Sequence, residues 1–185
     1  MLGIAASVLV ASPEDADSWV AARVDEGADY IKVVIDLPGF DQETVNALVV
    51  AAHIRGRKVI AHASRSDAVA MAQAAGVDIL THAPLDRAID TAQAEALVAA
   101  GAIIVPTLTM MEGLVEGLKR AGIPGPAYGP ARASVAAAHA AGIPILAGTD
   151  ANVAPGAPSQ PPYGESLHHE LELLVDAGLT PAEAL

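Results

Sequence analysis

The sequence predicts an α/β protein in which helices cover a parallel sheet. Short apolar segments alternate with longer helix-like segments throughout the 185 residues, and a glycine stands shortly before most of the apolar segments. These segments are continuous apolar runs, as expected for parallel strands that are buried on both faces. Strands separated by helices imply right-handed crossover connections. We therefore expect a series of βα units in one sheet.

Five segments are predicted to be strands, because each is a short apolar run bounded by turn-forming residues. They are residues 30–35, 58–62, 77–82, 102–108 and 143–147.

The predicted helices lie between these strands. The first follows Ser12, because a proline and two acidic residues come next, as at many helix N-termini, and it ends near Gly27. The other helices are expected at residues 42–54, 66–75, 91–100, 131–141 and 165–177, with a further helix start at Thr180. Two long loops, 112–130 and 151–164, follow strand ends, where barrels carry their functional loops.

The number of strands predicts a partial barrel. A closed TIM (β/α)8 barrel needs eight strands and about 250 residues. About five parallel strands with flanking helices correspond to strands 4–8 of such a barrel. We expect a single incomplete barrel domain over residues 1–185 that lacks strands 1–3.

The composition excludes several classes of protein. Hydrophobic residues make up 52% of the chain and charged residues 17%, which is too apolar for a disordered protein. The net charge of -12 argues against nucleic acid and membrane surfaces as partners. The absence of cysteine excludes thiolate metal sites and a cysteine nucleophile. No apolar run is long enough for a membrane span. We expect a cytoplasmic protein that acts on a small-molecule substrate, with a homo-oligomer left open.

Four ionisable residues lie within or at the end of apolar segments. Lys32 lies inside the first strand, His62 and His82 close the next two, and Asp150 ends the segment 144–150. Barrel strands point alternate residues inward, and their C-terminal ends form the active-site face. These four side chains are therefore expected to converge in one pocket.

The four residues suit a metal centre. Imidazole and carboxylate groups bind Zn²⁺ and similar divalent ions. A protonated lysine repels a metal, but carbamylation of Lys32 by CO₂ would give a carboxylate that can bridge two ions, and burial near cations favours the neutral amine. Asp150 would bind a metal and take a proton from the metal-bound water, whose pKa falls to about 7.

Six short motifs extend over nearly the whole chain. They are Tyr-Ile-Lys-Val (30–33), Val-Ile-Ala-His-Ala (59–63), Gly-Val-Asp-Ile-Leu-Thr-His (76–82), Val-Pro-Thr-Leu (105–108), Ala-Gly-Thr-Asp-Ala (147–151) and the segment 167–185 that begins with Leu-His-His-Glu-Leu. Each motif alone is weakly specific. Their ordered set resembles the later part of the barrel in metal-dependent hydrolases of the amidohydrolase superfamily, with the imidazolonepropionase-like and Xaa-Pro dipeptidase-like members as the nearest subgroup.

The resemblance implies a function and a set of roles. Lys32 would be the carbamylated lysine that bridges two metals, His62 and His82 would hold the second metal, and Asp150 would bind the first metal and act as general base. His168 would lie near the active-site end and is a weak candidate for substrate binding. The implied reaction is hydrolysis of a non-peptide or dipeptide-like C–N bond by metal-activated hydroxide.

The implied first-metal site is incomplete. The family holds that metal with a His-x-His pair on its first strand, and this sequence contains no His-x-His. We also expect this chain to lack the family's small flanking β-domain. We expect one or two divalent ions, zinc foremost, in the intact family, and one or none here. A single ion held by the Lys32 carbamate, His62 and His82 is an alternative.

Structural roles and other functions compete with this hypothesis. Lys32 could pair with an acid, the two histidines could belong to the core, and Asp150 could cap a turn. A Schiff-base aldolase with Lys32 as nucleophile is a lower-ranked alternative, because it leaves His62, His82 and Asp150 without a joint purpose. A catalytically silent half-barrel that self-associates through open sheet edges is a non-enzymatic alternative.

Overall fold

The computed structural model describes residues 10–36 and 39–185. Its centre is a four-stranded sheet with the strand order β1-β2-β3-β4, and all neighbouring strands are parallel. The strands are β1 (Tyr30–Val34), β2 (Lys58–His62), β3 (Ile79–Thr81) and β4 (Ile103–Val105). Strands that follow one another in sequence are neighbours in the sheet, as successive βα units require. The predicted α/β class with a partial barrel is confirmed.

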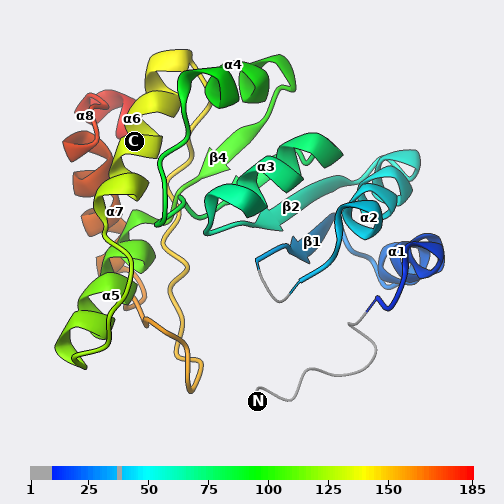
Figure 1. Cartoon of the computed structure of the whole chain (residues 1–185), viewed down its shortest axis with the longest axis horizontal. Helices are drawn as coiled ribbons and strands as arrows, with labels where there is room; N and C mark the ends of the chain where they lie inside the picture. Colours follow the sequence, from blue (N-terminus) through cyan, green and yellow to red (C-terminus); the bar gives the residue numbers. More distant parts are fainter. Residues whose placement is uncertain (1–9, 37–38) are drawn as a thin grey trace.

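The helices form two groups. In Figure 1, α1 to α4 follow one another along one side of the sheet, and α5 to α8 gather beyond β4. The helices are η2 (Pro13–Asp15), α1 (Ala16–Asp25), α2 (Gln42–Ile54), α3 (Ser66–Ala75), α4 (Thr91–Ala99), α5 (Leu108–Arg120), α6 (Gly129–Ala141), α7 (Glu165–Asp176) and α8 (Pro181–Ala184). The buried apolar residues form two clusters, and α6 contributes to both, with Ala138 in one and Val135 in the other.

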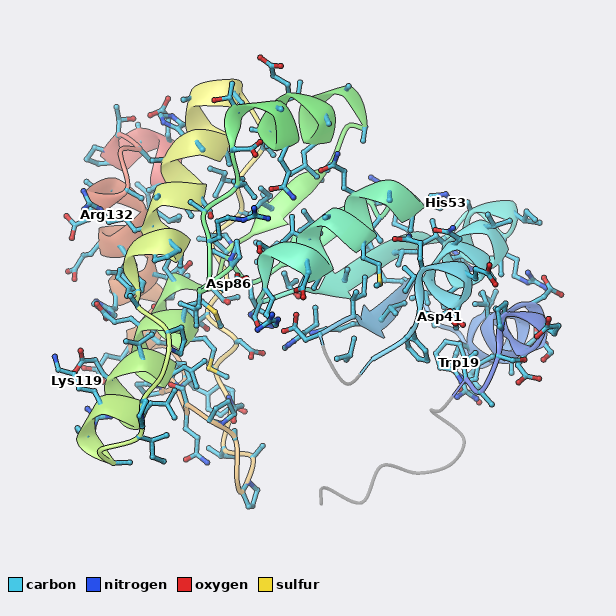
Figure 2. All side chains as sticks on the ribbon, in the orientation of Figure 1. Trp19, Asp41, His53, Asp86, Lys119 and Arg132 are labelled. Atoms are coloured by element: carbon cyan, nitrogen blue, oxygen red, sulfur yellow. The ribbon has the colours of Figure 1, made fainter. Side chains whose placement is uncertain are left out.

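The second helix shows how the sequence determines a helix start. Asp41, at the N-terminal end of α2 in Figure 2, accepts a hydrogen bond of 2.8 Å from the backbone N–H of Thr44, as expected for an N-cap residue. At the other end of α2, His53 lies 2.8 Å from Asp78, whose carboxylate also accepts the backbone N–H of Val59. These contacts hold α2 against the starts of β2 and β3.

Only one face of the first strand is covered. Ile31 and Val33 are buried against the helices, whereas Tyr30 and Val34 on the other face are 53% and 54% exposed. The sequence predicts strands buried on both faces, and β1 contradicts that expectation. The physical reason is that the helices α1 to α4 lie along the same side of the sheet (Figure 1).

The predicted fifth strand, residues 143–147, is wrong as a strand. This segment joins the sheet through one isolated bridge between Ile145 and Ile104. Two hydrogen bonds flank the bridge, from Ile104 N–H to the Pro144 carbonyl at 3.0 Å and from Leu146 N–H to the Ile104 carbonyl at 2.9 Å. Pro144 has no N–H to extend the ladder, so the segment lies beside β4 without becoming a regular strand.

The predicted strand 102–108 and the predicted loop 112–130 are both corrected. The strand ends at Val105, and the helix α5 occupies Leu108–Arg120. Glycine disfavours helices, which is why the sequence pattern at Gly113 does not predict one. A Cβ atom on Gly113 would lie 2.2 Å from the Ser159 hydroxyl, so this glycine leaves room for the loop 151–164. That loop is confirmed, because it contains no helix or strand.

No helix in residues 10–36 and 39–185 is long and apolar enough to cross a membrane.

Leu48 tests the packing of α2 on the sheet. Leu48 is 1% exposed, so its replacement by alanine leaves a cavity, and we expect Leu48→Ala to lower the free energy of unfolding by about 2–5 kcal/mol. The matched control on the same helix is Ile54→Ala, because Ile54 is 75% exposed, and its cost should stay below about 0.5 kcal/mol. Chemical denaturation measures both values, and equal losses would contradict the described packing.

Candidate functional site

His62 and His82 meet at the C-terminal ends of β2 and β3. The parallel register pairs His62 with Thr81, so His82 lies one residue beyond the end of β3. The Nε2 atom of His82 is 2.8 Å from Nδ1 of His62, and the ring centroids are 4.3 Å apart in an edge-to-face arrangement. The structure therefore brings together two of the residues that the sequence singles out.

Asp36 binds the ring nitrogen of His62 that points away from His82. It follows β1, and its Oδ2 atom lies 3.1 Å from His62 Nε2. The carboxylate also accepts the backbone N–H of Ser64 at 2.9 Å and the Ser64 hydroxyl. Burial opposes ionisation of Asp36, but the hydrogen bonds from His62 and Ser64 outweigh it and hold the pKa of this carboxyl below its usual value.

Thr107 occupies the other side of His82. Its hydroxyl oxygen is 2.6 Å from His82 Nδ1. The Asp36 carboxylate can only accept, so His62 Nε2 carries a proton, and in the uncharged form of the ring Nδ1 is the acceptor. His82 then donates from Nε2, and Thr107 donates its hydroxyl proton to His82 Nδ1. All four ring nitrogens thus have partners.

Burial keeps His82 neutral. The side chain is buried (3% exposed) and borders a small apolar pocket with Leu80 and Ile104. Desolvation first, and then the electrostatic influence of His62 and Lys32, lowers the pKa of His82 to about 3. A neutral imidazole is the form that binds metals.

Three residues at strand ends have a backbone conformation that is uncommon for residues other than glycine. His82 has φ 72°, Thr107 has φ 49° and Asp150 has φ 52°. They follow β3, β4 and the Ile145 bridge in turn, and in the described part of the chain no other non-glycine residue has a positive φ. Such strain is frequent at functional sites, so the backbone independently marks this edge of the sheet.

Lys32 lies on the uncovered face of β1. It pairs in register with Ile60 of β2. Because Ile60 is two residues before His62, Lys32 and His62 lie on the same face of the sheet. Its side chain is exposed, and its charge reaches His82, where it contributes to the lowered pKa. The structure therefore places Lys32 near the histidine pair, on the solvent side.

Asp150 and His168 lie outside the contacts of the histidine pair. Asp150 is exposed, and its backbone carbonyl accepts a hydrogen bond of 3.0 Å from the Asn152 side chain. His168 is exposed on α7. Its neighbour His169 instead makes a contact of 2.6 Å with Glu112 on α5, and this hydrogen bond raises the pKa of His169.

The side chains around the histidine pair offer few ligands to a metal ion. Within the described residues, no three His, Asp or Glu side chains are grouped closely enough to hold one. The two facing nitrogens of His62 and His82, 2.8 Å apart, do fit a pair of ligands, because both rings are anchored through their outer nitrogens. Ligand nitrogens of one tetrahedral zinc are roughly 3.3 Å apart, so a small separation of the rings would be needed.

Sequence reasoning missed three residues of the site. Asp36 directly follows a predicted strand, the same signal that identifies His62 and His82, and it could have been found that way. Thr107 lies in the Val-Pro-Thr-Leu motif, but nothing in that motif indicates a contact with His82. Glu170, fully buried on α7, accepts the backbone N–H groups of Leu108 and Thr109, and no sequence signal connects residues so far apart.

The low pKa of His82 makes stability depend on pH in the metal-free protein. Its pKa is about 3 in the folded chain and 6.5 ordinarily. Between these values the unfolded chain binds a proton that the folded chain does not, so the free energy of unfolding should decrease as pH falls from about 6.5 towards 3. The decrease amounts to about 1.4 kcal/mol per pH unit.

Denaturation of wild type and His82→Asn at pH 7 and pH 5, with chelator present, measures this effect. The drop between the two pH values should be smaller in the variant. A His82 resonance that titrates near pH 6.5 in the folded protein would contradict the described burial.

The chain was compared with known proteins by sequence. No protein-family model matches it. Uncharacterised proteins of Mycobacterium tuberculosis and Mycobacterium bovis are 27% identical to it over 187 aligned positions, which cover 90% of this chain and 46% of each relative. The chain thus spans about half the length of the curated relatives it matches.

Solved structures are similar over almost the whole chain. A Xaa-Pro dipeptidase with methionine bound in its active site has a TM-score of 0.77 at 23% identity, covering 99% of this chain and 49% of that one. An amidohydrolase of unstated source has a TM-score of 0.72 at 25% identity, covering 94% and 43%. The ochratoxinase of A. niger has a TM-score of 0.73 at 25% identity, covering 95% and 41%. The structural neighbours of this chain are members of the amidohydrolase superfamily, and the chain corresponds in fold to about half of each.

Proposed function

We propose that this chain is a metal-dependent hydrolase of the amidohydrolase type, or the part of such an enzyme that carries the ligands of its second metal ion. The observation that supports the proposal most directly is the facing pair His62 Nδ1 and His82 Nε2, 2.8 Å apart. The outer nitrogens of both rings are already bound, to Asp36 and to Thr107. The inner nitrogens face each other, and a metal ion that replaced this contact would meet two rings already oriented through their outer nitrogens, as metal-binding histidines are.

His62 and His82 are the residues that would hold the metal. When bound, a divalent ion such as zinc supplies Lewis acidity and lowers the pKa of water to about 7. Asp36 fixes the orientation of His62 through the 3.1 Å contact at Nε2. Burial keeps His82 neutral, so its ring can donate a lone pair at neutral pH.

Lys32 and Asp150 are proposed to complete the site. The neutral amine of Lys32 would add to CO₂ and release a proton, which gives a carbamate as a third ligand. Its position on the same sheet face as His62 and the proximity of its charge to His82 support this role. Asp150, at the end of the segment bridged to β4, is proposed as a further ligand and as the base that takes the proton of the attacking water.

The substrate is proposed to be a small molecule with an amide-like or cyclic C–N bond. The support comes from the structural neighbours, which include a dipeptidase and an amidohydrolase. Because the chain matches less than half the length of these enzymes, catalysis by the chain alone is part of the proposal. A cytoplasmic location stays a prediction from the sequence.

Zinc binding tests the proposed site. We expect the purified chain, dialysed against zinc, to retain close to one equivalent by metal analysis. His62→Asn and His82→Asn should each weaken zinc affinity by at least about 10-fold, because each removes one of two anchored ligands. The control is His139→Asn, because the His139 side chain contacts Glu183 at 3.4 Å instead. Less than about 0.1 equivalent in wild type, or equal loss in the control, would contradict the proposal.

A second candidate is a non-catalytic protein that self-associates. The observation that favours it is the uncovered face of β1, where Tyr30 and Val34 are more than half exposed. β1 also ends the sheet of the described residues, and an open edge strand favours pairing with another copy.

Sedimentation velocity distinguishes this candidate. If the uncovered face of β1 mediates association, Tyr30→Glu should shift the chain towards monomer, because the substitution puts a charge into an apolar contact. Val50→Glu on α2 is the matched control, since Val50 is 56% exposed on a helix instead. A wild-type chain that stays monomeric over the accessible concentration range would rule out this candidate.

A further inference from the structure

Thr107 stands at the N-terminus of α5 but does not cap it. A threonine at this position usually turns its hydroxyl towards the N–H groups of the first helical turn. Here the residue is in the left-handed conformation and makes no side-chain cap. Its hydroxyl contacts His82 Nδ1 at 2.6 Å instead, and the side chain is 3% exposed. The Thr107 hydroxyl therefore binds the His82 imidazole and not the first turn of α5.

Glu170 takes over the capping of α5 from a distant helix. Its two carboxylate oxygens accept the N–H of Leu108 at 2.9 Å and the N–H of Thr109 at 2.7 Å. Glu170 is 0% exposed, and burial raises its pKa while these two backbone hydrogen bonds oppose the rise. A negative charge is favourable at a helix N-terminus. The first two N–H groups after Thr107 are therefore satisfied without its hydroxyl.

A hydroxyl group next to His82 Nδ1 has a consequence for metal binding. Without a metal, His82 donates from Nε2 to His62, and the Thr107 hydroxyl donates to Nδ1. With a metal on Nε2, the ring proton must move to Nδ1, which then needs an acceptor. A hydroxyl is both donor and acceptor, so Thr107 can serve both tautomers by rotating its proton.

We propose that Thr107 is the positioning residue that lets His82 change tautomer for metal binding, and that Glu170 positions Thr107 by capping α5 in its place. This inference rests on the proposed metal site at His62 and His82. It assigns no ligand role to Thr107 or Glu170, since both act through the ring of His82.

The first test replaces the hydroxyl. Thr107→Val keeps the shape but removes both hydrogen-bonding functions, and we expect zinc affinity to fall about 10- to 100-fold. Thr107→Ser restores the hydroxyl and should stay within about threefold of wild type. Competition with a chromophoric chelator measures the affinities. Equal affinity in Thr107→Val and wild type would overturn the role of Thr107.

The second test asks whether Glu170 acts through Thr107. Glu170→Gln replaces one acceptor with an N–H donor at the end of α5, and we expect zinc affinity to fall about 10-fold. If Glu170 acts only by holding Thr107, the double variant with Thr107→Val should bind zinc no more weakly than Thr107→Val alone. Losses that add up in the double variant would overturn this role.

Asp90→Ala is the matched control for the loss of a cap. Asp90 caps α4 by accepting the N–H of Gln93 at 2.8 Å, on a different helix from the one that Glu170 caps. Its replacement should lower the thermal midpoint and leave zinc affinity unchanged. If Asp90→Ala weakens zinc binding as much as Glu170→Gln does, the effect of Glu170 is one of general stability and the proposal fails.

A measurement without metal separates this inference from the proposed function. In chelator-treated protein labelled with ¹⁵N at histidine, the His82 Nδ1 resonance of wild type and Thr107→Ser should be displaced from that of Thr107→Val, because only the hydroxyl variants hydrogen-bond this nitrogen. The same resonance in all three proteins would overturn the Thr107 contact. Failure of wild type to bind zinc despite a displaced resonance would refute the metal site and with it the tautomer exchange, while the hydrogen bond would stand.

Discussion

The parallel hydrogen-bond ladder continues past the ends of β2, β3 and β4, and the site depends on this continuation. Ala63 N–H bonds to the Thr81 carbonyl at 3.0 Å, and His82 N–H bonds to the Val105 carbonyl at 3.1 Å. These bonds set the heights at which His62 and His82 leave the sheet. A shift of register by one residue would move a side chain to the other face, so the meeting of the two imidazoles is a consequence of backbone pairing.

A continuous series of polar contacts then extends from one end of the sheet to the second group of helices. Asp36 contacts His62, His62 contacts His82, and His82 contacts Thr107. The next residues of α5 are held by Glu170. Much of this series is removed from water, where an unpaired polar group is costly. Each member therefore constrains the orientation of the next.

The parts of the structure that follow from local pattern could be predicted from the sequence. The strands ending near His62 and His82, the helix after Asp41 and the loop 151–164 belong to this class. Pro144 in the sequence already disfavours a regular fifth strand, because proline lacks an N–H for the ladder. The sequence pattern does not predict the helix after Thr107, because Gly113 disfavours a helix and its close approach to Ser159 cannot be read from the local sequence. The positive φ of His82 and the reach of Glu170 across the chain depend on tertiary packing, which no local pattern contains.

The close approach of Ser159 to Gly113 limits what this position can carry. The segment containing Ser159 begins just after Asp150, and the helix containing Gly113 begins just after Thr107. Because glycine has no side chain, the loop lies directly against the backbone of α5 at this point. Any larger residue at position 113 would have to displace either the loop that follows Asp150 or the helix that follows Thr107. The absence of a single methyl group is therefore what allows these two segments to pack together.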